Sequence, residues 1–348
     1  TNVDYHQYNF RANVDANMTK TTLLSLNMET IITKRNSPGY GDNNNALWSA
    51  QANLPATIVP VKYSNGTLPS FGRNSDEVSP YVQLNYTGFT ETRNLTTNLM
   101  VDLSQDLDFI TKGLKFYGRF SYDAYNTHEV HRLTSPDLYH AEKQRDRYGD
   151  LVLKKVADAQ PLSPNTIAWG DRRYYTEANL NYNRVFGEKH RVGGLLLYYQ
   201  QEYTRTDGGT DPYKIVPYRN MALSGRATYS YDDRYMVEFN FGYTGSENFE
   251  KNKRFGFFPA VAFGWMVSNE KFVKDHVGWL NQLKLRYSFG EVGNDKMSDD
   301  KRFPYITTLQ NDGNYHFGNL GVTNKGGIRI ATLGTSGLTW EVARKHNF

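Results

Sequence analysis

The fold class is decided by the stretch Tyr235-Met236-Val237-Glu238-Phe239-Asn240-Phe241-Gly242-Tyr243. Aromatic and aliphatic residues occupy every second position, and Glu238, Asn240 and Gly242 stand between them. Successive side chains of a β-strand point to opposite faces of a sheet. This period of two therefore predicts a strand with one aromatic face and one polar face. Asp232 and Asp233 precede it, and we expect them to form a tight turn.

The same alternation recurs along the chain in runs of about 10–15 residues. Soluble strands usually have ~5–6 residues, whereas a strand that crosses a bilayer at a tilt needs about 9–11. We therefore predict an all-β chain whose strands form part of a transmembrane antiparallel β-barrel. The eleven predicted strands span residues 7–17, 21–33, 89–103, 113–126, 172–186, 190–204, 219–231, 234–246, 256–267, 282–292 and 338–348.

The connections between the predicted strands alternate between short turns and long polar loops. This asymmetry is typical of outer-membrane barrels, which have short turns on one side of the membrane and long loops on the other. The short turns are Met18–Lys20, Gly187–Lys189 and Asp232–Asp233, and the long segments are roughly Thr33–Gly88, Asn126–Asp171, Arg205–Arg219 and Gly293–Gly337.

Two local features bear on this topology. Tyr229, Tyr231 and Tyr235 flank the Asp232–Asp233 turn, where an interfacial aromatic girdle is expected.

The stretch Pro80–Tyr86 looks strand-like, but counting it as a spanning strand would put two long loops on opposite sides. We therefore assign it to the first long loop.

Composition excludes several classes of protein. The 348 residues include 14% aromatic residues, which does not suit a disordered chain despite a mean hydropathy of −0.67. The apolar uncharged stretch Phe255 to Asn269 is too short for a spanning helix of ~20 residues. The absence of cysteine excludes disulfides and thiolate sites. A net charge of +4, from 40 basic and 36 acidic residues, is too balanced to indicate a nucleic-acid partner.

The strand count suggests that the chain is part of a larger barrel. Bacterial single-chain barrels have even strand numbers, and two open edges would leave unpaired backbone groups in hydrocarbon. The terminal Phe348 is similar to the last aromatic residue of complete barrels, and Trp340 and Val342 are in phase with it. Arg344 and His346 are in phase too and do not fit a lipid-facing row. We therefore favour a partial barrel over a native terminus.

Several stretches together resemble the barrel of the SusC/RagA family of TonB-dependent outer-membrane transporters. The most specific is the block Leu223–Phe272, with a hairpin at Ser224–Tyr235 and the run Lys253–Trp265. The supporting stretches are Tyr8–Asp15, Leu283–Gly290 with Gly293-Asn294, and Leu338–Glu341 with Lys345 and Asn347.

The resemblance implies a barrel of 22 strands with an N-terminal plug inside and a SusD-like lipoprotein outside. We expect residues 1–348 to be a partial barrel without the plug or the TonB box. The implied partners are outer-membrane lipids, a SusD-like surface lipoprotein, the TonB complex acting through the plug, and a glycan or peptide substrate. The implied location is the cell outer membrane.

No residue of the chain is predicted to be catalytic, to bind a cofactor or to bind a metal. His128-Glu129-Val130-His131 is one residue short of H-E-x-x-H, which needs a helix, so we expect an exposed loop there. Gly334-Thr335-Ser336-Gly337 is not a nucleophile elbow. The acidic residues Asp295, Asp299 and Asp300 match no calcium loop, and Gly41–Asn45 is also expected to be a plain loop.

Two groups of residues remain open as substrate contacts. Aromatic residues of the long loops could contact a ligand, pack the loops together or meet the partner lipoprotein; they are Trp48, Tyr63, Trp169, Tyr213 and Tyr315. Polar residues expected to face the lumen are better explained as contacts to a plug or to water; they are Arg119, Glu177, Arg226, Glu238, Lys284 and Arg286.

The predicted function is nutrient import across the outer membrane, with no enzymatic activity. One alternative is a complete small outer-membrane barrel, either a porin or a twelve-stranded hydrolase. The hydrolase would need a Ser–His pair near the rim, and the 8 histidines offer no convincing candidate. A soluble carbohydrate-binding module is a third reading, for which the strands are too long.

Overall fold

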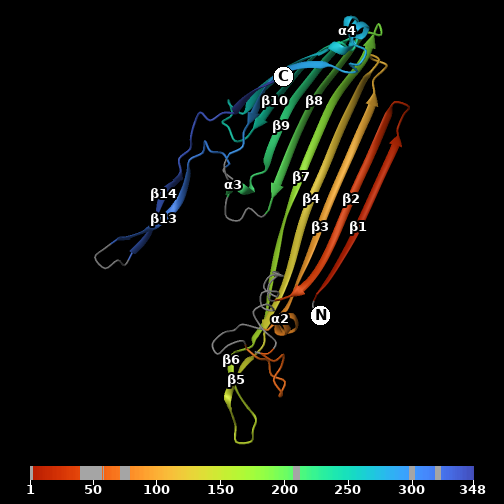
Figure 1. The fold of residues 1–348 in the computed structure, drawn as a ribbon. Coiled ribbons are helices and arrows are strands. Elements are labelled where there is room, and N and C mark those ends of the chain that lie inside the picture. Colours follow the sequence, from red (N-terminus) through yellow and green to blue (C-terminus); the bar gives the residue numbers. More distant parts are fainter. Residues whose placement is uncertain are drawn as a thin grey trace. The chain divides into compact units, whose positions relative to one another are not determined.

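A computed structural model describes residues 3–39, 57, 59–70, 79–206, 212–297, 302–317 and 323–348. Its main element is an 11-stranded sheet (Figure 1) in which each neighbouring pair of strands is hydrogen-bonded. In sheet order the strands are β1 (Asp4–Asn17), β2 (Thr22–Pro38), β3 (Gly88–Asp106), β4 (Leu114–Ser135), β7 (Gln160–Phe186), β8 (His190–Arg205), β9 (Tyr218–Tyr231), β10 (Tyr235–Ser246), β11 (Phe255–Met266), β12 (Lys284–Asn294) and β15 (Glu341–Asn347).

The connections carry the remaining described elements. Two hairpins are separate from the main sheet: β5 (Leu138–Arg145) with β6 (Leu151–Ala157), and β13 (Thr308–Phe317) with β14 (Thr323–Thr332). The helices are α2 (Pro80–Tyr86), α3 (Pro212–Ile215), the 3₁₀ turn η1 (Val267–Asn269) and α4 (Lys271–His276). Among the described residues, no helix has the length and apolar composition to cross a membrane.

All eleven strands predicted from the alternation are present, in the predicted order. The strands differ from prediction mainly where they run into the long connections, since β2 extends to Pro38, β4 to Ser135 and β7 back to Gln160. The predicted polar loop over Asn126–Asp171 is therefore wrong. Its outer parts continue β4 and β7, and its middle forms the β5–β6 hairpin, because polar residues on both faces of a strand leave no alternation to detect.

The strand-like interpretation of Pro80–Tyr86 is also wrong, because this stretch is the helix α2. Ser79 caps it by accepting a hydrogen bond from the Val82 backbone N at 3.4 Å. Pro80 follows in the first turn, where its missing N–H costs no hydrogen bond. The assignment of Pro80–Tyr86 to the connection between the second and third strands is confirmed.

The two tightest hairpins are set by residues with positive φ. Asp232 and Asp233 have φ of 52° and 50°, and Gly187 and Glu188 have φ of 52° and 62°. Such turns match the right-handed twist of the strands they join. They leave β9–β10 and β7–β8 in continuous antiparallel register without bulges.

The chain divides into two units, which are described separately. Unit 1 comprises residues 1–11, 29–97 and 124–170, and unit 2 comprises residues 12–28, 98–123 and 171–348. Unit 1 contains a small hydrophobic cluster of Leu68, Val82 and Leu138, against which Tyr81, Tyr86 and Ala157 pack. This cluster joins α2 to the β5–β6 hairpin and to the segment before residue 70.

Candidate functional site

The sheet of unit 2 has one apolar and one polar face. Directly opposed residues of antiparallel strands share a face, and the register aligns Tyr198, Leu223, Tyr243 and Phe257 in one row. Their side chains are between 37% and 54% exposed, although all four are large and apolar. A face of this kind has to be covered by something other than water.

Charged and amide side chains form hydrogen-bonded ladders on the opposite face. On β7, Glu177 accepts hydrogen bonds from the Tyr175 hydroxyl at 2.6 Å and from Asn179 Nδ2 at 2.7 Å. Asn181 Nδ2 in turn donates to Asn179 Oδ1 at 2.6 Å. On β10, Asn240 Nδ2 donates to Glu238 Oε1 at 2.7 Å. These contacts along each strand fix the side chains that would face an aqueous lumen.

The structure brings most of the predicted lumen residues together on this polar face. The register places Glu177, Arg226, Glu238, Lys284 and Arg286 on it. Glu238, Lys284 and Arg286 also line a cavity of about 300 Å³. Arg119, on β4, forms a two-pronged ion pair with Asp102 of β3, at 2.7 and 3.1 Å.

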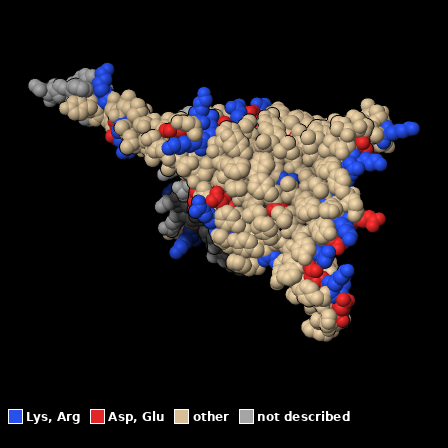
Figure 2. Space-filling model, turned by 90° about the horizontal axis from the view of Figure 1, so that it is seen from above, with Lys and Arg blue, Asp and Glu red and all other residues tan. Residues whose placement is uncertain are grey.

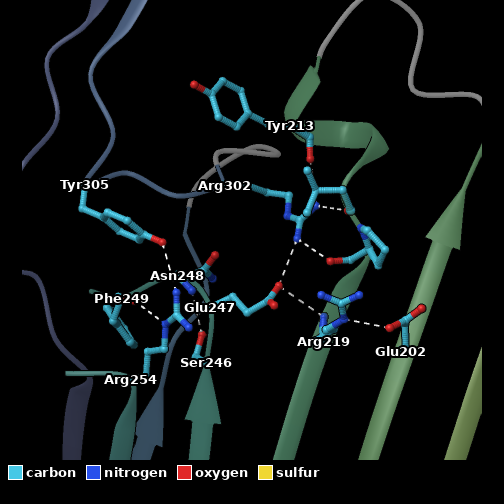
Figure 3. Close-up of polar contacts among 12 residues, drawn as sticks. Glu202, Tyr213, Arg219, Ser246, Glu247, Asn248, Phe249, Arg254, Arg302 and Tyr305 are labelled. Atoms are coloured by element: carbon cyan, nitrogen blue, oxygen red, sulfur yellow. Dashed lines mark hydrogen bonds and ion pairs between the residues drawn. The ribbon is translucent and has the colours of Figure 1, made fainter. Parts of the chain in front are cut away.

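Three connections of unit 2 meet around Arg302, whose side chain is only 6% exposed (Figure 3). Its Nη1 donates to the carbonyl oxygens of Tyr213, at 2.8 Å, and of Val216, and its Nη2 donates to Pro217 O at 3.0 Å. The guanidinium lies over the rings of Tyr218, at 3.7 Å, and Phe303, at 4.6 Å. One planar cation therefore binds the end of α3 through several parallel contacts.

Glu247 links Arg302 to the ends of the neighbouring strands. Its Oε2 accepts from Arg302 Nη2 at 3.3 Å and from the backbone N of Arg219 at 3.4 Å. The Arg219 side chain turns the other way, and its Nε donates to Glu202 Oε2 at 2.7 Å. The charges of β8, β9, the β10–β11 connection and the β12–β13 connection are thus joined in one network (Figure 3), which we call the rim network.

Aromatic packing supports the rim network from the β10–β11 connection. Phe249 is 1% exposed and packs on Trp340, with ring centroids 5.4 Å apart. Arg254 Nε donates to Phe249 O at 3.2 Å, and Trp340 Nε1 donates to Arg254 O at 3.2 Å. Arg254 Nη2 also lies 3.5 Å from the Tyr305 hydroxyl. These contacts tie the chain before β15 to the same corner of the molecule.

A cavity of about 450 Å³ borders the rim network. Its lining includes Tyr174, Thr176, Glu202, Arg219, Arg254 and Phe255. Apolar walls with a few placed charges are the usual composition of a small-molecule site, and the volume lies within the usual range.

The sequence did not single out the residues that build this site. Arg302 and Glu247 are 55 positions apart, and their contact has no local sequence signal. Arg254 and Phe255 stand in the run that carries the family resemblance, which is the only sequence signal that points to this corner.

The prediction of an exposed loop at His128–His131 is wrong, because these residues lie on β4. His131 is half-buried, with Nδ1 3.1 Å from Thr90 Oγ1 and Nε2 3.2 Å from Glu129 Oε2. Both ring nitrogens therefore have protein partners, and Glu129 shares the face of His131 rather than that of His128. Within the described part of the chain, no three His, Asp or Glu side chains are grouped as metal ligands.

Three of the aromatic residues predicted to lie in loops contact other residues of the chain, and Trp169 lies on β7. The Tyr63 hydroxyl donates to Tyr139 O at 3.3 Å and accepts from the Ala141 N at 3.1 Å. Trp169 packs on Tyr125 at 5.3 Å, and Tyr213 lies 6.1 Å from Phe303. Tyr315 lies on β13 with its side chain 66% exposed. Trp48 lies outside the described residues.

The remaining loop candidates are placed only in part. Gly334–Gly337 precedes β15, where the backbone N of Gly334 donates to Thr307 Oγ1 at 3.0 Å and that of Thr335 to Pro304 O at 2.9 Å. These bonds join the two ends of the connection that carries the β13–β14 hairpin. The carbonyl of Asp295 accepts from Asn248 Nδ2 at 3.0 Å. Asp299, Asp300 and Gly41–Asn45 lie outside the described residues.

A second charged cluster surrounds the β9–β10 turn, at the strand ends opposite the rim network. Arg234 lies 2.9 Å from Asp232 Oδ2 and 3.0 Å from Glu270 Oε2, and Trp265 Nε1 donates to Glu270 Oε1 at 3.0 Å. Hydrogen bonds from Tyr235 and then Trp265 hold the pKa of Glu270 below its usual range, and Arg234 acts in the same direction. We call this group the turn cluster.

Charged pairs also hold the loops of unit 1. Lys155 Nζ is 2.7 Å from both Asp137 Oδ1 and Asp158 Oδ1, and the bond to Asp137 is the main cause that raises the pKa of Lys155. The same contact lowers the pKa of Asp137.

Figure 2 shows basic and acidic side chains intermixed on the visible face, among a larger area of other residues.

Comparison with known proteins identifies relatives of this sequence. No protein-family model matches it. Three curated relatives are TonB-dependent receptors. SusC of Bacteroides thetaiotaomicron is 29% identical over 208 residues, which are 53% of this chain and 20% of SusC. P39 of Formosa agariphila is 27% identical over 198 residues, 50% of this chain and 18% of P39. P26 of the same organism is 25% identical over 371 aligned residues, 96% of this chain and 33% of P26.

Solved structures show the same fold. The RagAB peptide importer in its closed-closed state aligns with a TM-score of 0.61 and 16% identity, covering 98% of this chain and 37% of that chain. A second structure of the RagAB peptide transporter gives a TM-score of 0.62 and 15% identity, covering 99% and 38%. This likeness confirms the predicted fold class, part of a transmembrane antiparallel β-barrel.

The chain aligns with only a fifth to a third of the curated relatives' length, 18% to 33%. Within that span, the resemblance predicted from the block Leu223–Phe272 is confirmed. The chain is therefore a homologue of the SusC-type TonB-dependent receptors, and its location is the outer membrane.

Proposed function

We propose that this chain is the wall and loop portion of an outer-membrane transporter that imports a glycan or peptide nutrient. The observation that carries the proposal is the two-faced sheet of a TonB-dependent receptor homologue. Its apolar rows are exposed, and its polar face carries hydrogen-bonded ladders such as Tyr175–Glu177–Asn179. An apolar band toward lipid and a polar lining toward a pore is the arrangement that passage of a hydrophilic solute requires.

In this proposal, residues 1–348 form one barrel-wall domain, and the long connections hold the substrate or its lid. Import against a gradient needs an energy source, and the TonB complex is the proposed one, because every curated relative named above is a TonB-dependent receptor. A SusD-like surface lipoprotein is the proposed partner at the loop end. The protein is proposed to carry out transport without covalent chemistry.

The nutrient class is the finer part of the proposal. The solved neighbours are named as importers of peptides, and a relative is named SusC. Both a glycan and a peptide suit a cavity lined by Tyr174, Phe255 and charged groups, because aromatic faces stack on sugar rings and charged groups bind peptide termini.

Uptake measurements test the proposal in the native organism. A strain without the gene and a complemented strain would be given labelled oligosaccharides and labelled oligopeptides in turn. We expect one class to lose uptake in the deletion strain and to regain it on complementation. We also expect a protonophore or loss of TonB to abolish that uptake, because the import is energised.

Two results would contradict the proposal. Uptake that depends on the gene but not on TonB would indicate a passive porin, which is the alternative small-barrel reading. Uptake unchanged by the deletion, together with hydrolysis of an extracellular substrate lost in the same strain, would indicate an outer-membrane hydrolase.

A further inference from the structure

The apolar face of unit 2 changes character at the strand ends next to the rim network. Every second residue of a strand lies on the same face. On β8 the apolar face carries Tyr198, Gln200 and Glu202, and on β9 it carries Leu223, Met221 and Arg219. Glu202 and Arg219 are directly opposed in the register and form an ion pair at 2.7 Å. The face that is aromatic along the middle of the strands therefore ends in a charged row.

This charged row marks a boundary between hydrocarbon and a polar layer. Arginine on the lipid face of a barrel costs about 2–4 kcal/mol at the bilayer midplane and almost nothing at the interface. The Glu202–Arg219 row lies beside the β8–β9 connection, at the end of the strands that carries the long loops. In an outer-membrane barrel the long loops are extracellular, so the row lies at the headgroup level of the outer leaflet.

The cavity of about 450 Å³ lies at this boundary. Most of its lining follows two rows of the apolar face, Tyr174–Glu202–Arg219 and Thr176–Gln200–Met221–Gly245–Phe255. Intervening residues of the same strand ends and Glu247 complete the lining. The ring of Phe255 lies over Gly245, where an added Cβ would come within 2.7 Å of it. The side chains of these two rows thus place most of the cavity wall on the lipid-facing side.

The cavity has one cationic group on this face, Arg219, available for an anion. Arg219 uses Nε for Glu202, and among the described residues neither of its Nη atoms has a hydrogen-bond acceptor. Arg254 directly precedes Phe255 and so has the opposite phase, and its guanidinium contacts Phe249 O and the Tyr305 hydroxyl instead. Glu247, which also lines the cavity, is already bound to Arg302. Guanidinium groups with free N–H donors bind phosphate in a planar, two-pronged geometry.

We propose that this cavity binds the phosphate-bearing headgroup of a lipid in the outer leaflet. Arg219 binds the phosphate, Phe255 and Met221 contact the apolar part of the lipid, and the acyl chains continue along the Tyr198–Leu223–Tyr243–Phe257 row. A lipid is favoured over a soluble nutrient because the site continues directly into the apolar face. The proposal needs the outer-membrane location and not the import activity, so either can fail without the other.

Native mass spectrometry of the full-length protein in detergent tests this site. The protein would be titrated with bisphosphorylated lipid A, with the same glycolipid lacking both phosphates, and with inorganic phosphate as competitor. We expect the phosphorylated lipid to bind at least about tenfold more tightly than the dephosphorylated one, as for other charge-assisted contacts. Inorganic phosphate should compete only weakly, because it has no acyl chains.

Three variants locate the binding. Arg219→Ala should weaken lipid binding about tenfold or more, and Arg219→Lys should weaken it less, since the charge remains but the planar fork is lost. Thr176→Trp fills the cavity from an exposed position without removing a charge, and should weaken binding even if Arg219→Ala disturbs Glu202. Arg184→Ala is the matched control, because Arg184 lies on the same face in β7, near the opposite strand end, and should bind lipid as the unchanged protein does.

Several outcomes would overturn the proposal. Equal lipid binding by the unchanged protein and all four variants would mean that the lipid coats the apolar belt without this site. Equal affinity for the phosphorylated and dephosphorylated lipid would rule out recognition of the phosphate. Strong competition by inorganic phosphate would assign the site to a soluble anion. Loss of nutrient uptake in Thr176→Trp with lipid binding unchanged would assign the cavity to the transport path.

Discussion

The loops of unit 1 and the loops of unit 2 are held together by opposite means. In unit 1, α2 and the β5–β6 hairpin enclose the apolar cluster of Leu68, Val82 and Leu138. In unit 2, the connections that flank β9 to β12 converge on the single guanidinium of Arg302. One region therefore excludes water with a small core, and the other satisfies polar groups around one buried cation.

This difference determines how each region responds to change. Apolar contacts are numerous and individually weak, so a cluster loses stability in proportion to the atoms removed. A buried cation with several acceptors behaves as a unit, because removing it leaves all its partners without a donor at once. The rim network is thus the more brittle of the two, and it is also the one that borders the cavity.

The largest effect is expected from Arg302→Met, which keeps much of the stem and removes the cation. Glu247 and the carbonyl oxygens of Tyr213, Val216 and Pro217 would lose their shared donor, and breaking such a buried pair costs about 3–5 kcal/mol. We expect faster amide hydrogen exchange in residues 212–219 and 247–254. Exchange in the central part of β9 and β10 should stay slow.

Arg329→Met in β14 is the matched control for this variant. Arg329 lies 3.4 Å from Asp312, and both side chains are more than half exposed, so the loss should be at most about 1 kcal/mol. If Arg302→Met and Arg329→Met change exchange to the same small degree, the contrast between the two units is wrong.

A smaller effect is expected from Leu138→Ala in unit 1. Leu138 is 2% exposed, and truncating a buried leucine costs about 2–5 kcal/mol, with the low end expected where a small cluster can collapse around the gap. Limited proteolysis should cut faster within residues 79–87 and 138–157. Val152→Ala, at a position 40% exposed on β6, should leave the cleavage rate nearly unchanged.

Tyr63→Phe removes the polar contact that accompanies the unit 1 cluster. The Tyr63 hydroxyl bridges Tyr139 O and the Ala141 N, and loss of such a hydrogen bond costs about 0.5–1.5 kcal/mol. We expect a modest rise in amide exchange at Ala141, smaller than for Leu138→Ala. An effect larger than that of Leu138→Ala would show that the unit 1 loops are also held mainly by polar contacts.

The main sheet could be predicted from the sequence because each strand carries its own signal. Tyr235–Tyr243 alternates without interruption, and its observed partners β9 and β11 alternate in matching phase. The ends of β4 and β7 were missed because residues such as Thr127, His128 and Thr134 are polar on both faces. The helix α2 was assigned to a long loop and looked strand-like, although Ser79-Pro80 is a helix start signal, because its seven residues are too few to show a period.

The candidate site was beyond sequence reasoning for a different physical reason. Arg302 contacts residues 213–217 and Glu247, and these contacts are set by how three long connections fold back on one another. No period or motif encodes such a meeting. By contrast, the polar-face residues Glu177, Glu238 and Arg286 were found, because their positions follow directly from the phase of their strands.

The smallest effect is expected for the turn cluster. An ion pair holds it, as in the rim network, but the acid of this pair, Glu270, has a lowered pKa. Because the folded-state pKa of Glu270 lies below its ordinary value, the cluster is stabilised above that ordinary value and loses this stabilisation as the pH falls through the folded pKa. Protonated Glu270 would bind Arg234 and the Trp265 indole more weakly. We therefore expect Trp265 fluorescence to change in the acidic range below the ordinary glutamate pKa of about 4.3, with little change between neutral pH and that value. Glu270→Gln should remove the acidic transition while keeping an acceptor for Trp265, and a transition that persists in Glu270→Gln would contradict its assignment to Glu270.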